Sequence, residues 1–253
     1  MLDTAKSHFD DDIKRARDLL MSSDLDGING GIKADIYRAA WMMAVGACDA
    51  FFSDAYADLI SRSIRAAEFQ PTAQIPERLK GLKMPVAAVL NPANSGWRWR
   101  MAARELIQTE NVLSLEKIRK LFNQFCRNNK KILNKSALET WILSPGSKQR
   151  LFGITPTEYR ALTSDRDKEN ARKRALTKLE SRFQQIFQRR HDCIHNCDRP
   201  KITPQNISKH QVEKVIEDIS FLVHRCYEDL IDEFPKYLAG LGFSGQTRNR
   251  VGA

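Results

Sequence analysis

Ten residues from 189 to 198, RRHDCIHNCD, bring arginine, histidine and cysteine side chains together at close spacing. Two of the five histidines in the chain, His191 and His195, lie in this segment. Histidine changes charge near neutral pH and can exchange protons, whereas arginine stays protonated and its planar guanidinium matches a phosphate. Together they can move protons between the 2′ hydroxyl and the leaving 5′ oxygen of RNA and stabilise the phosphorane between them. The segment therefore contains the residue types that RNA cleavage requires.

The same segment also contains potential metal ligands, because His191, Cys193, His195 and Cys197 alternate along it. Two histidines four residues apart on a helix could hold a zinc ion. The spacing does not match a common zinc finger, however, and no second cluster of paired cysteines occurs elsewhere in the chain. Zinc binding is therefore kept as an alternative interpretation of this segment.

A long helix from about Asp165 to Arg190 is predicted to carry these residues. Its apolar residues recur at spacings of three and four, which predicts one packed face and one basic, solvent-exposed face. Continuing the apolar stripe puts Arg190 on the packed side, where an arginine needs a partner. Asn196 and Pro200 are expected to stop the helix.

Helical spacing also occurs over residues 5–22, about 32–67 and about 205–238. The middle of the second stretch, AAWMMAVGACDAFF, is apolar nearly all round, as expected of a helix at the centre of a bundle. Asp49 interrupts it, and a carboxylate buried there is costly unless it is paired or neutral. No strand pattern stands out, so the predicted class is all-α.

Residues 68–164 have a different character. Four prolines between positions 71 and 92 interrupt regular periodicity, which predicts an irregular excursion with short helical pieces. Further along, Ser114 is predicted to cap a helix that ends near Phe125, and TPTE at 155–158 has the pattern of a capping box.

The segment around Arg190 resembles the ribonuclease motif of the HEPN-domain family, RiboL-PSP-like or a related branch. In that motif an arginine and a polar residue are followed, after four to six residues, by a histidine near a helix end. Arg190, His191 and His195 match it, and Arg189 offers a second register. The acidic residue before paired aromatics in CDAFF and the closing amphipathic helix are also similar to the family's four-helix core.

The resemblance implies an all-α, HEPN-like bundle that forms a single domain of residues 1–253. Four long core helices would lie at about 5–67 and 165–238, with a mostly helical insertion at 68–164. The tail at 242–253 is predicted to be flexible.

The resemblance further implies a metal-independent endoribonuclease, a homodimer with its active site at the interface, that leaves 2′,3′-cyclic phosphate and 5′-hydroxyl ends. His195 would exchange the proton, Arg190 would stabilise the phosphate, and His191 would orient the site. Asp49 is predicted to pair with Arg190 or with a histidine. By family analogy the protein would be a toxin or antiviral defence effector with a neutralising antitoxin or a sensor as partner.

The helix itself limits how these residues can cooperate. In a continuous helix, residues five apart point about 140° away from each other, so Arg190 and His195 would not share a face. Either the helix ends between them or the two residues act on RNA from different protomers.

A net charge of +10 favours polyanionic partners, among which we expect RNA. The residues expected to contact RNA are Arg189, Arg172, Lys173, Arg174, Arg199 and Lys201. The five scattered cysteines, the lack of an apolar stretch near the N-terminus and the lack of an 18-residue apolar window predict a cytoplasmic protein without membrane contact.

Two other functions fit the same pattern. One is a non-catalytic module of the same fold that binds RNA, a nucleotide or a protein. The other is a DNA-binding or structural helical protein, in which Trp97 and Trp99, interleaved with Arg98 and Arg100, could stack on bases and hold phosphates.

Overall fold

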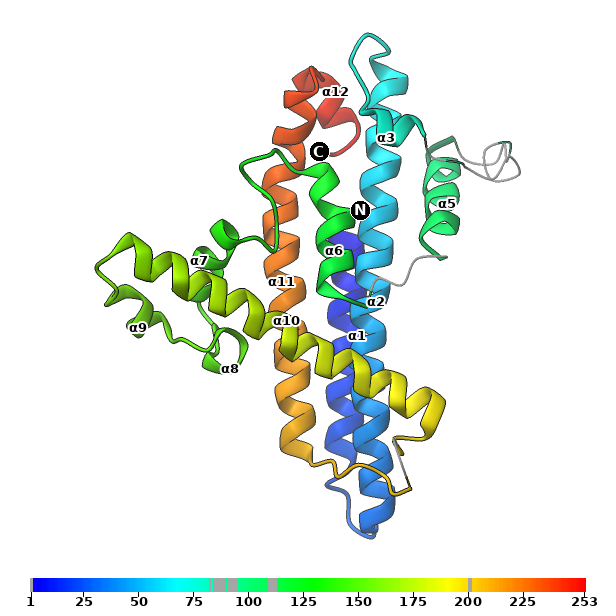
Figure 1. Ribbon diagram of the computed structural model, residues 1–253. Helices are drawn as coiled ribbons and strands as arrows, with labels where there is room; N and C mark the ends of the chain where they lie inside the picture. The colour runs from blue at the N-terminus through cyan, green and yellow to red at the C-terminus, as the bar shows by residue number, and fades with distance from the viewer. Residues whose placement is uncertain (1, 82, 84–89, 91–94, 109–112, 200–201) are drawn as a thin grey trace.

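The computed structural model is built from helices joined by turns (Figure 1). It describes residues 2–81, 83, 90, 95–108, 113–199 and 202–253. These residues contain no strand, which confirms the all-α class that the sequence predicts. Within them, no helix is long and apolar enough to cross a membrane.

Three long helices run side by side in Figure 1, with bounds close to the predicted ones. They are α1 (Leu2–Ser22), α2 (Gly30–Phe69) and α11 (Lys209–Gly240). The buried stripe of α1 includes Phe9 and Ile13 at helical spacing, and Phe9 meets Phe51 of α2 edge to face at 5.9 Å. The nearly all-round apolar composition of α2 therefore reflects its contacts with several neighbours.

The fourth long helix, α10 (Asp165–Asn196), crosses the other three instead of running alongside them (Figure 1). The four long helices that the sequence predicts are thus present, three as a bundle and the fourth crossing it. The predicted stripe on α10 does pack inward, because Leu179, Phe183 and Ile186 are fully buried. Trp41 of α2 fastens the crossing by donating its indole N–H to the carbonyl of Ile186 at 3.1 Å.

The described part of the segment predicted as an irregular insertion contains several short helices. Their bounds are α3 Glu77–Lys80, α5 Ser95–Gln108, α6 Leu115–Phe122, a 3-10 turn at Asn123–Phe125, α7 Lys135–Leu143, α8 Gln149–Phe152 and α9 Pro156–Arg160. The predicted cap at Ser114 is confirmed, since its side chain accepts from the backbone of Lys117. The capping box of Thr155 and Glu158 is also present.

This segment shares its core with the long helices. Phe122 of α6 lies 5.5 Å from Phe52 of α2, and Phe125 lies 6.3 Å from Phe234 of α11, both edge to face. In addition, buried Trp141 of α7 donates to Asp229 at 2.8 Å. Removing the segment would therefore expose the bundle, which a separable insertion would not do.

The C-terminal residues 242–253 are not the flexible tail that the sequence predicts. They contain α12 (Gly245–Arg250), capped by Ser244, and Phe243 and Val251 on either side of it are buried. Arg62 of α2 donates to the carbonyl of Gly252. Two apolar anchors and a helix cap therefore hold this segment against α2.

Candidate functional site

The C-terminal end of α10 presents two histidines on one face. His191 and His195 are one helical turn apart and exposed, with ring centroids 4.4 Å from each other. The helix continues through Asn196, which overturns the idea that it ends between Arg190 and His195. These two side chains therefore diverge as expected on a continuous helix, and one copy of α10 cannot direct both at one phosphate.

Arg190 is half-buried on α10, close enough to Asp49 of α2 for its charge to act on that carboxylate. Burial raises the pKa of Asp49, and the nearby positive charge of Arg190 partly offsets that rise. Among the described residues, neither side chain takes part in an ion pair. The two charges thus influence each other without forming the direct pair that the sequence predicts.

Arg189, which offers the second possible register of the motif, makes contacts that stabilise the fold. It donates to Asp198 at 2.9 Å and to backbone carbonyls at 205–206, and its guanidinium lies 5.1 Å from the ring centre of Trp41. Asp198 is fully buried and also accepts from Arg38 of α2 at 2.8 Å. Arg189 therefore holds a buried carboxylate instead of facing RNA, which leaves Arg190 as the better match to the motif.

The turn that follows α10 has an unusual backbone. Cys197 and Asp198 both adopt left-handed conformations, with φ of 48° and 57°, which side chains other than glycine seldom accept. The ion pairs of Asp198 and a hydrogen bond from the backbone of Gln205 to its carbonyl, at 2.8 Å, hold this turn. The helix end that carries His195 is therefore fixed by contacts remote in sequence.

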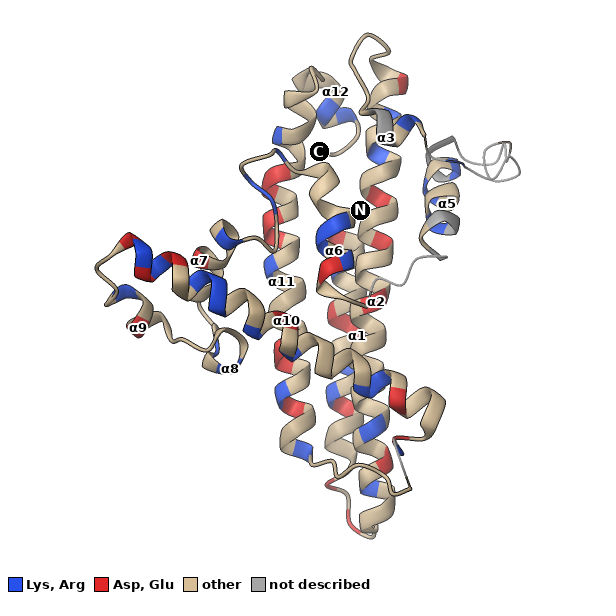
Figure 2. Cartoon of the chain, in the orientation of Figure 1, with Lys and Arg blue, Asp and Glu red and all other residues tan. Residues whose placement is uncertain are grey.

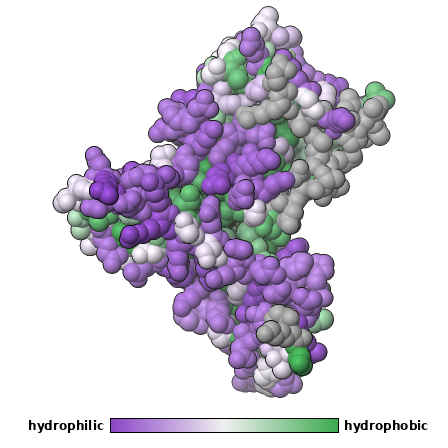
Figure 3. Space-filling view, in the orientation of Figure 1, coloured by the Kyte–Doolittle hydropathy of each residue, from purple (hydrophilic) through white to green (hydrophobic). Residues whose placement is uncertain are grey.

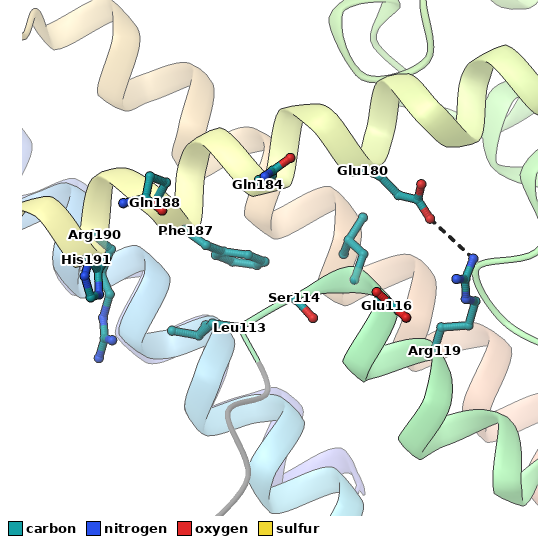
Figure 4. A pocket seen from close by; sticks show the side chains of 11 residues that line it. Leu113, Ser114, Glu116, Arg119, Glu180, Gln184, Phe187, Gln188, Arg190 and His191 are labelled. Carbon is teal, nitrogen blue, oxygen red and sulfur yellow. Dashed lines mark hydrogen bonds and ion pairs between the residues drawn. The ribbon is translucent and has the colours of Figure 1, made fainter.

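A hollow of about 700 Å³ opens beside this end of α10, between α10 and α6 (Figure 4). Arg190 and His191 lie at one end of it, and the ion pair of Glu180 with Arg119, at 3.3 Å, lies at the other. The α10 residues that face it recur every three or four positions from 180 to 191. Sequence analysis missed this face, although its polar periodicity was a usable signal.

The predicted RNA-contacting residues do not gather around this site. Arg172 is half-buried in ion pairs with Glu139 and Glu169, and Lys173 lies 3.7 Å from Glu169. Eighteen residues separate Arg172 from Arg190, about 27 Å along a helix axis. The other predicted contacts are Arg174 and Arg199, both exposed, and Lys201, which lies outside the described residues.

The surface charge is mixed. Figure 2 shows acidic and basic residues interspersed over the visible face, so the net charge of +10 does not gather there in one basic patch. Several arginines serve buried carboxylates, as Arg150 and Arg182 do for fully buried Asp218, each at 2.8 Å. Charge alone therefore does not mark a nucleic-acid site.

The segment of α5 in which tryptophan and arginine alternate also makes contacts within the fold. The guanidinium of Arg98 lies 4.8 Å from the ring centre of Trp99 and pairs with Glu68, and Arg100 lies 3.8 Å from Asp54. The side chain of Trp97 lies outside the described part of the chain. Both described arginines are thus held by α2, which argues against a base-stacking surface here.

The described residues contain no group of three or more His, Cys, Asp or Glu side chains that could hold a metal ion. Burial raises the pKa of the half-buried Cys193 thiol to about 11.

Comparison of the chain with models of protein families, with curated proteins and with solved structures found no match. A function for the chain therefore has to be argued from its own geometry.

Proposed function

We propose that the chain is a metal-independent endoribonuclease whose chemistry takes place at the C-terminal end of α10. The observation that carries this proposal is an exposed, closely spaced histidine pair beside Arg190. Many other arginines of the described chain are held in ion pairs, whereas Arg190 is in none. A proton-exchanging pair next to an available guanidinium is the combination that RNA cleavage needs.

The proposed reaction is an attack of the ribose 2′ oxygen on the neighbouring phosphorus. His195 takes the proton of the 2′ hydroxyl and, once protonated, gives a proton to the leaving 5′ oxygen as its bond to phosphorus breaks. Arg190 stabilises the negative charge of the phosphorane, and His191 orients the site. The products are a 2′,3′-cyclic phosphate and a 5′ hydroxyl, and no metal or other cofactor takes part.

We further propose that the active unit is a homodimer with the site at its interface. Arg190 and His195 diverge on one uninterrupted helix, so a second copy of α10 would supply the missing group. Two-fold symmetry would create two equivalent sites. The role by family resemblance is that of a cytoplasmic toxin or antiviral defence effector, controlled by an antitoxin or a sensor.

The test is cleavage of a mixed RNA pool in EDTA, with identification of the product ends. We expect cyclic phosphate ends from the wild type and a rate at least ~100-fold lower for His195→Ala, because general acid–base groups contribute that much. His210→Ala is the matched control, since His210 is an exposed histidine near the start of α11. Equal rates for the wild type and His195→Ala would refute the assigned role.

A non-catalytic module is the second candidate, and the mixed charge around the site favours it over a DNA-binding protein. Folded protein that binds RNA in the same assay without cleaving it would establish this alternative. DNA binding would instead show as a higher, salt-dependent affinity for duplex DNA than for single-stranded RNA.

A further inference from the structure

The hollow between α10 and α6 lies next to the residues that we propose cleave RNA. Arg190 and His191 line one end of it, so RNA whose phosphate met Arg190 would bring a neighbouring nucleotide to its opening (Figure 4). Its volume of about 700 Å³ lies within the roughly 300–1,000 Å³ of sites that enclose small ligands. A nucleotide base therefore fits in size and position.

The lining suits a flat ring with polar edges. Leu113, Leu115 and Phe187 supply apolar surface, and Gln184 and Gln188 extend from α10 above it. In Figure 3 hydrophobic residues show among hydrophilic ones near the centre of the visible face. Bases in single-stranded RNA are recognised by contact with their faces and by hydrogen bonds to their edges.

The charges of the hollow disfavour a second phosphate. Apart from Arg190 and His191, its charged residues are Glu116, Glu180 and Arg119, and Arg119 is already paired with Glu180 at 3.3 Å. Away from Arg190 and His191 the remaining charges therefore leave one carboxylate unbalanced, which disfavours a second phosphate there but accepts a neutral base.

The hydrogen-bonding groups favour a base that can donate. Among the described residues, the exposed amide of Gln184 has no side-chain partner, so it is available to a ligand. Gln188 uses its amide nitrogen on Asp192 at 2.9 Å, which leaves its carbonyl oxygen as an acceptor. Together with Glu116, these acceptors can take both N–H bonds of an exocyclic amino group, as in adenine and cytosine, whereas uracil offers a single N–H, at N3.

We propose that this hollow binds the base next to the scissile phosphate and selects an amino-bearing base over uracil. This inference rests on the proposed ribonuclease function. It adds Gln184 as a specificity-determining residue, contributed by the same helix that carries the chemistry.

The experiment is to sequence the cleavage sites that the protein makes in an RNA pool of random sequence. We expect cleavage beside adenine to exceed cleavage beside uracil, and Gln184→Ala to lower that ratio about tenfold, as expected when a base contact is lost. Gln185→Ala is the matched control, because Gln185 is the next residue of α10 and lies outside the hollow. An unchanged ratio in Gln184→Ala, or an equal shift in Gln185→Ala, would overturn the inference.

A second measurement separates this inference from the proposed function. Binding of adenosine and uridine monophosphates to the His195→Ala protein is followed by calorimetry, with Leu113→Trp added to fill the hollow. We expect adenosine monophosphate to bind more tightly and to lose that advantage in the Leu113→Trp variant. Equal binding of the two nucleotides overturns the base subsite, whereas absence of cleavage by the wild type refutes only the nuclease.

Discussion

Asp49 shows how one side chain can have competing electrostatic roles. The sequence predicts it as the partner of Arg190, yet burial raises its pKa more than Arg190 lowers it. An acid whose pKa is raised by folding binds its proton more tightly in the folded state. Stability therefore falls as the pH rises from the ordinary aspartate value of about 3.9 through the raised value.

Replacing this carboxylate with a neutral amide should stabilise the protein at neutral pH. We expect Asp49→Asn to have a higher free energy of unfolding than the wild type at pH 7, with the difference shrinking as the pH falls below about 4. Urea unfolding at several pH values measures this, with exposed Asp26→Asn as the control. A less stable Asp49→Asn at pH 7 would show that attraction to Arg190 outweighs the cost of burial.

At the scale of the element, the end of α10 depends on Asp198. This carboxylate draws together Arg38 of α2 and Arg189 of α10, and it stabilises the left-handed backbone after the helix. Asp218 is likewise fully buried and likewise pairs with two arginines. It lies inside α11, however, and not at the end of α10. Comparing substitutions of Asp198 and Asp218 therefore separates the effect of losing a buried charge from the effect of losing the contacts that hold the end of α10.

We expect Asp198→Asn and Asp218→Asn each to lower the free energy of unfolding by about 3 kcal/mol, because each leaves arginines short of a buried partner. Only Asp198→Asn should speed amide hydrogen exchange over residues 190–196 and reduce RNA cleavage. Exchange followed by mass spectrometry, together with the cleavage assay, distinguishes the two variants. The same exchange pattern in both would mean that Asp198 acts through global stability alone.

Local patterns predicted the elements well, because apolar spacing and caps are properties of neighbouring residues. The capping box at Thr155 and the cap at Ser114 are examples that the structure confirms. The Asp198 cluster was not predictable, since Arg38 lies 160 residues away in sequence. For the candidate site, the motif located the histidines, but the wall contributed by α6 depends on tertiary packing that no local pattern encodes.

At the scale of the whole molecule, the crossing of α10 over the three-helix bundle matters for the proposed dimer. In this arrangement His191 and His195 are exposed, while Arg190 is half-buried and acts electrostatically on Asp49 of α2. A partner protomer could therefore approach the histidines without disturbing the core.

Mixing two inactive variants tests whether the site spans two protomers. If Arg190 of one protomer acts with His195 of the other, mixed dimers of Arg190→Ala and His195→Ala contain one intact site. Half of the dimers would be mixed, so about a quarter of wild-type cleavage should return. Mixing either variant with the double variant is the control, and no recovery in stable mixed dimers would place both residues in one protomer.

The place of α11 in the chain has a consequence for biosynthesis. α11 completes the three-helix bundle, yet it begins only at Lys209, so α1 and α2 emerge from the ribosome long before their third partner. During that interval the apolar surface of α2 has no cover from α11, a state that promotes aggregation and invites chaperones. The turn after α10 also has no complete bundle beside it during that interval. Until α11 has been made, a nascent chain should therefore be a folding intermediate with an incomplete bundle.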